Sequence, residues 1–421
     1  MGTKAKSIWT FIAAGALLLA FAGCTAASGN NATPPTNDVG PLAIQGVQDD
    51  RLTAANNDFA FRMLQELRAH EPGENVFFSP LSISVALAMT WNGADGETRE
   101  DMAETLGFGD MEMEEVNAAF RHLLDALNNP SDGSDAEMAL RVVNSLWPRE
   151  DVTVHEDYRS RVLGAFDAEV FPLDMGDPES VDILNAWVEE QTEGKIDEIT
   201  DSLDANIVMI LLNAIYFLGS WEQPFDPDNT SAAPFRLADG TEREVSMMSQ
   251  SPRMDHLDGD GFQALRMPYD GGNVSMYVFL PDDDSSLDAF MDGLNPNAWE
   301  EWMDGFQDAQ GTLALPKFEM EYEVQLEEIL PGMGMEIAFG PGADFSAMTP
   351  NNPWIDEVKH KAIVEVHEEG TEAAAVTMVV MVESAPMGSF DFTVDRPFFF
   401  ALQDDDTGTL LFMGAVHDIG E

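Results

Sequence analysis

Histidine, cysteine and serine build most hydrolytic and metal sites, and this chain has few of them in a usable pattern. Of its seven histidines, three precede a glutamate (His70, His155 and His367), and none has the second histidine that a zinc peptidase helix requires. The sequence contains no phosphate-binding glycine loop and no Gly-x-Ser-x-Gly turn. We therefore predict no catalytic residue, no metal site and no cofactor, and nothing in the sequence argues for an enzyme.

The only cysteine, Cys24, follows a pattern that explains its position. Two lysines precede an almost wholly apolar run, residues 8–21, and Ala22-Gly23-Cys24 follows directly. This order is typical of a bacterial export signal and resembles that of a lipoprotein, in which the cysteine sulfur receives the lipid. We expect residues 1–23 to be removed and Cys24 to anchor the protein outside the cytoplasmic membrane, in the cell envelope or on the cell surface. A plain secretory signal and an uncleaved anchor are the alternatives.

Residues 24–49 are small and polar, contain prolines and show no sustained hydrophobic period, which is typical of a flexible tether. From residue 50 to residue 421 the composition is that of a folded protein, without an internal repeat or a second linker. We therefore expect a single domain over 50–421.

The charge is strongly one-sided, because 77 acidic residues oppose 20 lysines and arginines, for a formal net charge of −57. The acidic residues are dispersed between apolar stretches, so we interpret them as a solvated surface adapted to high salt, in preference to a calcium-binding or polycation-binding site. Nucleic acid is excluded as a partner, since phosphate contacts need clustered lysines and arginines, and the sequence has no such cluster.

Hydrophobic periodicity predicts helices over residues 52–69, 82–91, 115–127 and 181–191. Strand-like composition appears in the second half, over residues 274–280, 312–315, 362–366 and 410–416. Helices first and strands later predict an α+β fold, in which helices cover large sheets on one side.

Residues 364–387, VEVHEEGTEAAAVTMVVMVESAPM, are the most informative segment. They begin as a strand and reach Gly370, where the chain can bend. In strand geometry the next residues would place Thr371, Ala373, Ala375 and Thr377 on one face, all small and uncharged, with Glu372 on the other. Such a segment could enter the interior of a sheet without burying a charge. An ordinary helix of alanine and glutamate followed by a strand is the alternative.

Residues 368–375 (EEGTEAAA) resemble the hinge of the reactive-centre loop of the serpins, a family of serine protease inhibitors. Further segments resemble serpin motifs in the proper order: 75–84 (NVFFSPLSIS), 185–188 (NAWV), 192–196 (TEGKI), 213–221 (NAIYFLGSW), 315–318 (LPKF), 343–346 (ADFS), 395–398 (DRPF) and 411–414 (LFMG). The resemblance covers about residues 50–421. It implies a serpin fold, with a large, mostly antiparallel central sheet, further sheets, covering helices and an exposed reactive-centre loop.

The resemblance also implies a mechanism. A serine protease cleaves the exposed loop, and the loop's N-terminal arm then enters the main sheet as a new strand while the protease is still attached as an acyl-enzyme. The family's partners are serine proteases and some cysteine proteases. We expect a monomer that touches the membrane only through its N-terminal lipid.

Residue roles carry over by position. The hinge comprises Glu368, Gly370, Thr371, Glu372, Ala373, Ala374, Ala375, Val376 and Thr377. The polar cluster that gates opening of the sheet comprises Ser79, Ser82, Asn213 and His360. Insertion begins at Trp221, Lys317 and Glu368, and we predict a salt bridge between Lys317 and Glu368.

In inhibitory serpins the residue before the reactive bond is the seventeenth from the hinge glutamate, so the resemblance implies a reactive bond at Ser384–Ala385. The downstream Pro397 suggests a point near Pro386 instead, and the bonds at Val382 and Glu383 are further alternatives. A small residue before the bond suits an elastase- or subtilisin-like protease, while Glu383 leaves a glutamate-specific enzyme open. The alternative function is that of a non-inhibitory lipoprotein with the serpin fold, acting as a binding or structural protein. Such members usually carry bulky or charged residues on the inserting face of the hinge, and this chain does not.

Overall fold

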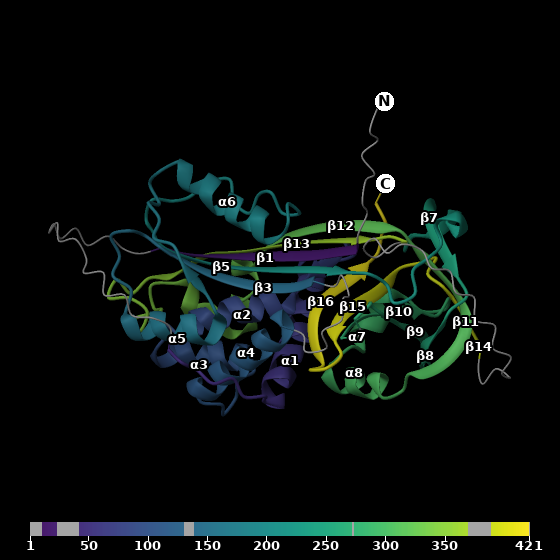
Figure 1. Cartoon of the computed structure of the whole chain (residues 1–421), viewed down its shortest axis with the longest axis horizontal. Coiled ribbons are helices and arrows are strands. Elements are labelled where there is room, and N and C mark those ends of the chain that lie inside the picture. Colours follow the sequence, from purple (N-terminus) through teal and green to yellow (C-terminus); the bar gives the residue numbers. More distant parts are fainter. Residues whose placement is uncertain (1–10, 23–41, 130–138, 272, 369–388, 421) are drawn as a thin grey trace.

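The computed structural model describes residues 11–22, 42–129, 139–271, 273–368 and 389–420 (Figure 1). Within them the helices are α1 (Asp50–His70), α2 (Pro80–Trp91), α3 (Gly96–Thr105), α4 (Met113–Asn128), α5 (Glu156–Phe166), α6 (Glu179–Gln191), α7 (Leu287–Asp292) and α8 (Pro296–Met303). Short helical turns lie at η1 (Pro227–Asn229), η2 (Leu326–Glu328), η3 (Pro331–Met335) and η4 (Glu336–Phe339). The four helices predicted from periodicity are confirmed as α1, α2, α4 and α6.

A six-stranded sheet forms the centre of the molecule, in the order β12-β13-β1-β5-β3-β4. Its strands are β1 (Phe11–Ala22), β3 (Ala139–Pro148), β4 (Glu169–Val170), β5 (Ile207–Gly219), β12 (Phe318–Gln325) and β13 (Trp354–Val366). All pairs are antiparallel except β3 with β4.

The second sheet has ten strands, in the order β2-β16-β15-β10-β9-β8-β11-β7-β6, with β14 paired to β11. Its strands are β2 (Val76–Phe78), β6 (Ser231–Arg236), β7 (Glu242–Gln250), β8 (Arg253–Asp258), β9 (Phe262–Pro268), β10 (Val274–Pro281), β11 (Gln307–Pro316), β14 (Ser389–Thr393), β15 (Phe398–Asp404) and β16 (Thr409–Val416). The strands predicted at 274–280, 312–315, 362–366 and 410–416 are confirmed within β10, β11, β13 and β16. The α+β fold class is likewise confirmed.

Helices cover the six-stranded sheet on both faces, so the expectation of helices on one side was wrong. The other helices of the N-terminal half lie under the sheet, and α6 lies across its opposite face (Figure 1). Leu184, Trp187 and Val188 of α6 pack with Ile210 and Leu212 of β5 in a core of their own. The physical reason is that β5 is apolar on both faces, which requires cover on both.

β1 is the most unexpected element, because it comes from the apolar run predicted to be an export signal. It lies between β5 and β13, in the middle of the sheet, although these strands are separated from it by about two hundred residues or more (Figure 1). Leu18, Leu19 and Ala20 are at most 1% exposed. Leu19 faces the main core, while Leu18 and Ala20 face the core under α6.

Residues 42–47, the last described part of the predicted tether, lie against the domain. The Leu42 amide donates to the Ser160 carbonyl at 2.9 Å, and the Val47 amide to the Ala118 carbonyl at 3.0 Å. These bonds fix the approach of the chain to α1. Within the described ranges, no helix is both long and apolar enough to cross a membrane.

Candidate functional site

The four residues assigned to gating meet beneath the middle of the six-stranded sheet. Pro80 starts α2, and Ser79 caps it by accepting the Ser82 amide on its hydroxyl at 3.1 Å. The amide of Ser79 donates to His360 Nε2 at 3.1 Å, and the Ser82 hydroxyl donates to Asn213 Oδ1. All four residues are 0% exposed. The start of one buried helix therefore holds polar groups from both β5 and β13.

Asn144 belongs to the same network and was missed from the sequence. It lies in β3 directly opposite Asn213, whose Nδ2 donates to Asn144 Oδ1 at 2.7 Å. Asn144 Nδ2 donates in turn to the Phe166 carbonyl at 2.7 Å. The available signal was an amide interrupting an apolar strand, in the run VVNSLW. The network of Ser79, Ser82, Asn144, Asn213 and His360 is called the gating network below.

The position between β5 and β13, called the slot below, lies directly above the gating network. β1 fills it, with Leu17 in register with Asn213 on one side and His360 on the other. The bonds from Asn213 and to His360 Nε2 run to α2 and β3 rather than across the slot. Exchange of the strand in the slot would therefore leave these three bonds in place, which matters because a buried polar group that loses its partner is costly.

The residues assigned to the start of insertion meet at the C-terminal end of β13. Lys317 Nζ lies 2.7 Å from Glu368 Oε2, which confirms the predicted salt bridge. The Thr230 hydroxyl donates to the other carboxylate oxygen, Oε1, at 2.7 Å. Burial by itself would raise the pKa of Glu368, but the hydrogen bonds from Lys317 and Thr230 outweigh it, and the pKa lies below its ordinary value. Glu368 is thus held ionised where β13 ends.

Trp221 completes this cluster. Its indole Nε1 donates to the His367 carbonyl at 3.1 Å, and its ring stacks on Tyr269 with the centroids 4.5 Å apart. The Phe225 amide donates to the Glu368 carbonyl at 3.0 Å. Thr230 and Tyr269 were not predicted, because they come from distant parts of the chain. Together these contacts fix the backbone from which the hinge departs.

The lysines of the domain gather around β13. Residues 50–421 contain four, at 195, 317, 359 and 361. Lys195 pairs with Glu365 at 2.6 Å, Lys359 with Glu323 at 3.6 Å, and Lys361 with Glu321 at 2.8 Å. With the Lys317 pair, every lysine of the domain forms an ion pair on or beside the strand that borders the slot.

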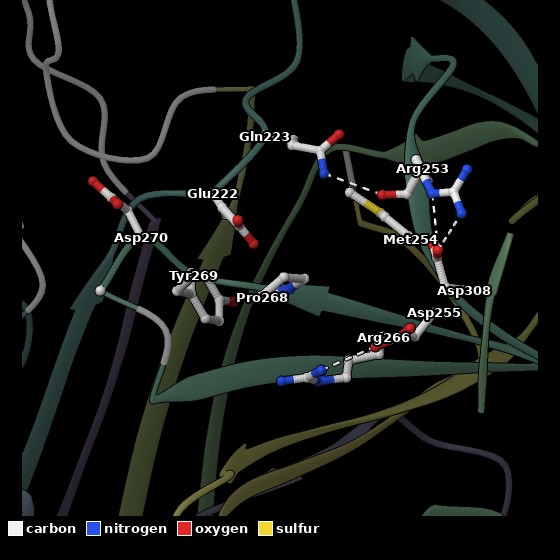
Figure 2. Close-up of a pocket in the computed structure, with 11 residues that line it drawn as sticks. Glu222, Gln223, Arg253, Met254, Asp255, Arg266, Pro268, Tyr269, Asp270 and Asp308 are labelled. Carbon is white, nitrogen blue, oxygen red and sulfur yellow. Dashed lines mark hydrogen bonds and ion pairs between the residues drawn. The ribbon is translucent and has the colours of Figure 1, made fainter. Parts of the chain in front are cut away.

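A hollow of about 350 Å³ is lined by Glu222 and Gln223, which follow β5, and by Tyr269 (Figure 2). Its arginines are occupied: Arg253 pairs with Asp308, and Arg266 Nη1 lies 3.0 Å from Asp255 Oδ2. Within the described part of the chain, no group of three or more histidine, cysteine, aspartate or glutamate residues is placed to hold a metal ion. We assign no cofactor to this hollow.

Several predicted residues lie outside the described residues. They are Cys24, the hinge residues Gly370, Thr371, Glu372, Ala373, Ala374, Ala375, Val376 and Thr377, and the reactive-bond candidates Val382, Glu383, Ser384 and Ala385. Their assignments stay predictions. The hinge glutamate, Glu368, is within the described residues and pairs with Lys317 at the end of β13.

Comparison with known proteins decides the family. The model of the family described as "Serpin (serine protease inhibitor)" matches residues 54–419. The chain is a serpin. It is 35% identical over 381 residues to Iripin-3 of the tick Ixodes ricinus, covering 88% of this chain and 95% of that protein.

Solved structures agree with this serpin over most of its length. Human thyroxine-binding globulin, complexed with thyroxine, is 31% identical with a TM-score of 0.78, over 88% of this chain and 99% of that one. Tengpin, a thermophilic serpin in the native state, is 28% identical with a TM-score of 0.79, over 90% and 97%. The serpin fold is thereby shown. The family is described as one of serine protease inhibitors, yet one of these relatives is a thyroxine-binding globulin, so membership alone does not separate inhibition from binding.

Proposed function

We propose that this serpin inhibits serine-type endopeptidases as a suicide substrate. The protease cleaves the loop after β13 and remains attached as an acyl-enzyme. The freed N-terminal arm of the loop then enters the slot as a new strand, and the attached protease is carried along the sheet before water can release it. The native state is therefore held kinetically rather than at its free-energy minimum.

One observation carries the proposal: the slot accommodates a complete strand running in the required direction. β1 pairs over twelve residues and is antiparallel to both β5 and β13. A loop that leaves β13 at Glu368 and folds back would also run antiparallel to both strands. The backbone ladders that receive β1 are thus the ladders an inserted loop would use.

The register of β1 supports the hinge assignment. Ile12 lies opposite Glu365. If Glu372 takes that place after a turn over residues 367–370, residues 371–382 replace residues 11–22. Leu19, which faces the main core, is then replaced by Val379. Because successive side chains of a strand point to opposite faces, every second residue before Val379 would also face the main core.

In that register the small hinge residues enter the core and the charged one does not. Thr371, Ala373, Ala375 and Thr377 share the face of Leu19, and Glu372 falls on the face covered by α6. Glu372 would lie opposite Glu365, a repulsive pair in a sheet unless a cation is shared. Lys195, 2.6 Å from Glu365, is in place to be shared.

The same register supports a reactive bond at Ser384–Ala385. Val382 would lie opposite Trp354, the first residue of β13, so Ser384 follows just beyond the end of the sheet. Full insertion would therefore carry an enzyme attached to Ser384 along the whole strand. The small residue before the bond favours an elastase- or subtilisin-like target, and the bonds at Val382 and Glu383 are the alternatives.

We further propose that the exported serpin is a monomer, anchored in the cell envelope or on the cell surface by a lipid on Cys24. The order of residues 1–24 supports the anchor. Mass spectrometry of the N-terminal peptide from exporting cells tests it. A mass without lipid, or a start other than residue 24, would refute the anchor without affecting the inhibitory function.

The experiment for the inhibitory function uses the protein purified after export. Incubation with elastase or subtilisin should give a covalent complex that survives boiling in detergent, and a released C-terminal fragment that starts at Ala385. A fragment starting outside residues 383–386 would refute the assigned bond. Complete hydrolysis without a complex would favour the alternative, a non-inhibitory binding or structural protein.

A further inference from the structure

We infer that the N-terminal segment 11–22 is an internal plug for the slot, which keeps the unprocessed chain from trapping proteases until the segment is removed. The inference rests on the proposed function, since it concerns the same slot. It assigns a second role to residues that the sequence marks as an export signal.

The segment fits the slot along its whole length. Every residue of Phe11–Ala22 pairs with β5, and the pairing with β13 runs from Ile12 to Ala22. The segment FIAAGALLLAFA contains no charged residue. By comparison, residues 371–382 (TEAAAVTMVVMV) include Glu372. The N-terminal segment therefore occupies the slot without bringing a charge into the sheet, whereas the loop would bring one.

The plug and the inserted loop exclude each other. Neighbouring strands lie about 4.8 Å apart, so a position between two paired strands holds one strand only. Both segments run in the same direction and would use the same amides and carbonyls of β5 and β13. The cleaved loop can therefore enter only after β1 has left, and water can release the protease during that delay.

Export processing would remove the plug completely. β1 ends at Ala22, and the predicted cleavage lies between residues 23 and 24. No residue of β1 remains in the chain that starts at Cys24, while α1, the gating network and β13 all remain. The removal thus opens the slot without deleting any other part of the sheet.

The first test measures whether the plug is seated in solution. The full chain, residues 1–421, is folded from denaturant in the absence of membranes, and amide hydrogen exchange is followed over residues 12–22. A seated strand should exchange at least about 100-fold more slowly than the same segment as a free peptide. Exchange at the free-peptide rate would overturn the inference, whatever the protein does to proteases.

The second test ejects the plug in the full chain. Leu19→Asp would bury a carboxylate in the main core, and Ala16→Pro would remove a ladder amide without adding charge. Both variants should lose the protection of residues 12–22 and gain the covalent complex with elastase or subtilisin. Leu42→Asp is the matched control, because Leu42 is 51% exposed and the same change there should alter neither readout.

The outcomes separate this inference from the proposed function. If the unmodified full chain traps protease as efficiently as the ejected variants, the plug does not block insertion and the inference is wrong, while the inhibitory function stands. If residues 12–22 are protected but neither the Leu19→Asp and Ala16→Pro variants nor the exported protein traps protease, the proposed inhibitory function is wrong. Trapping only by the ejected variants and the exported protein supports both.

Discussion

The two sheets of this serpin are built for different purposes. In the ten-stranded sheet, β10, β15 and β16 are buried throughout and pair in a continuous apolar layer. In the six-stranded sheet, the two central partners, β5 and β13, are joined only through a strand from the far N-terminus. The first sheet is a continuous core, whereas the second contains the slot, whose occupant changes in the mechanism proposed above.

The two sheets also differ in where their polar side chains form hydrogen bonds. Asn213 and His360 lie at the middle of the six-stranded sheet, and their bonds to α2 and β3 do not depend on the strand between them. At the edge of the ten-stranded sheet, the half-buried Asp405, which follows β15, accepts hydrogen bonds from Ser275 and Tyr277 of β10 at 2.6 and 2.7 Å, and so ties neighbouring elements together. In the proposed mechanism, the bonds of Asn213 and His360 to α2 and β3 would persist while the strand between β5 and β13 is exchanged.

The largest expected effect comes from placing a charge on the inserting face. Thr371→Arg in the exported protein would bury a guanidinium in the core during insertion, so hydrolysis should outrun trapping and the fraction of protease trapped should fall more than about tenfold. Gel quantification of the detergent-stable complex measures this fraction. Glu372→Arg is the matched control, because in the proposed register residue 372 would take the face under α6 rather than the face toward the main core. Equal trapping by Thr371→Arg and the unmodified protein would refute the hinge assignment.

High salt should stabilise the whole domain rather than one sheet. The net charge of −57 produces repulsion that weakens as the Debye length falls to about 3 Å at 1 M salt. We expect the thermal midpoint to rise by several degrees between dilute buffer and molar salt, with β5, β13, β10 and β15 gaining protection together in amide exchange. Equal midpoints in both buffers would contradict a salt-adapted surface.

Breaking the gating network should loosen one sheet selectively. Asn213→Ala leaves the Ser82 hydroxyl and Asn144 without their partner, at a cost of about 1–3 kcal/mol in the free energy of unfolding. Amide exchange should accelerate in β5 and β13 more than in β10 and β15. Val278→Ala in β10 is the control: the cavity it leaves destabilises the protein without this bias. Uniform acceleration in both sheets by Asn213→Ala would contradict the distinction drawn above.

A smaller, pH-dependent effect is expected where insertion starts. The pKa of Glu368 is lowered in the folded protein, so its contribution is present above the ordinary carboxyl pKa and is lost as the pH falls through the folded value. Lys317→Met should therefore cost about 1 kcal/mol at neutral pH and less in acid, by chemical denaturation at both pH values. The exposed pair Arg253–Asp308 supplies the control, since solvent screens it and Arg253→Met should cost less than Lys317→Met at neutral pH, with little change in acid. A cost that is independent of pH would show that Glu368 does not carry the effect.

The sequence predicted what depends on local pattern. α2, β10 and β16 follow from runs of apolar residues, and the salt bridge of Lys317 with Glu368 followed from the family resemblance. Asn144, Thr230 and Tyr269 were missed because their roles arise from pairing between segments far apart in the chain. α6 was predicted as a helix, but its place on the face opposite the other helices was not, since periodicity gives a helix its apolar face and not the sheet face that it covers.

β1 shows the limit most clearly. An apolar run of this length has the same composition whether it is an export signal or a central strand, and only the presence of a vacant position between β5 and β13 distinguishes the two. That position is made by residues about two hundred or more places away. No local pattern contains it.

Amide exchange over residues 371–382, before and after cleavage of the loop in the exported protein, tests the central claim most directly. If the loop inserts between β5 and β13, these amides should become protected on cleavage by at least about 100-fold, and the thermal midpoint should rise in the same sample. If residues 371–382 still exchange at the free-peptide rate after complete cleavage, no strand has entered the slot, and inhibition by insertion is contradicted.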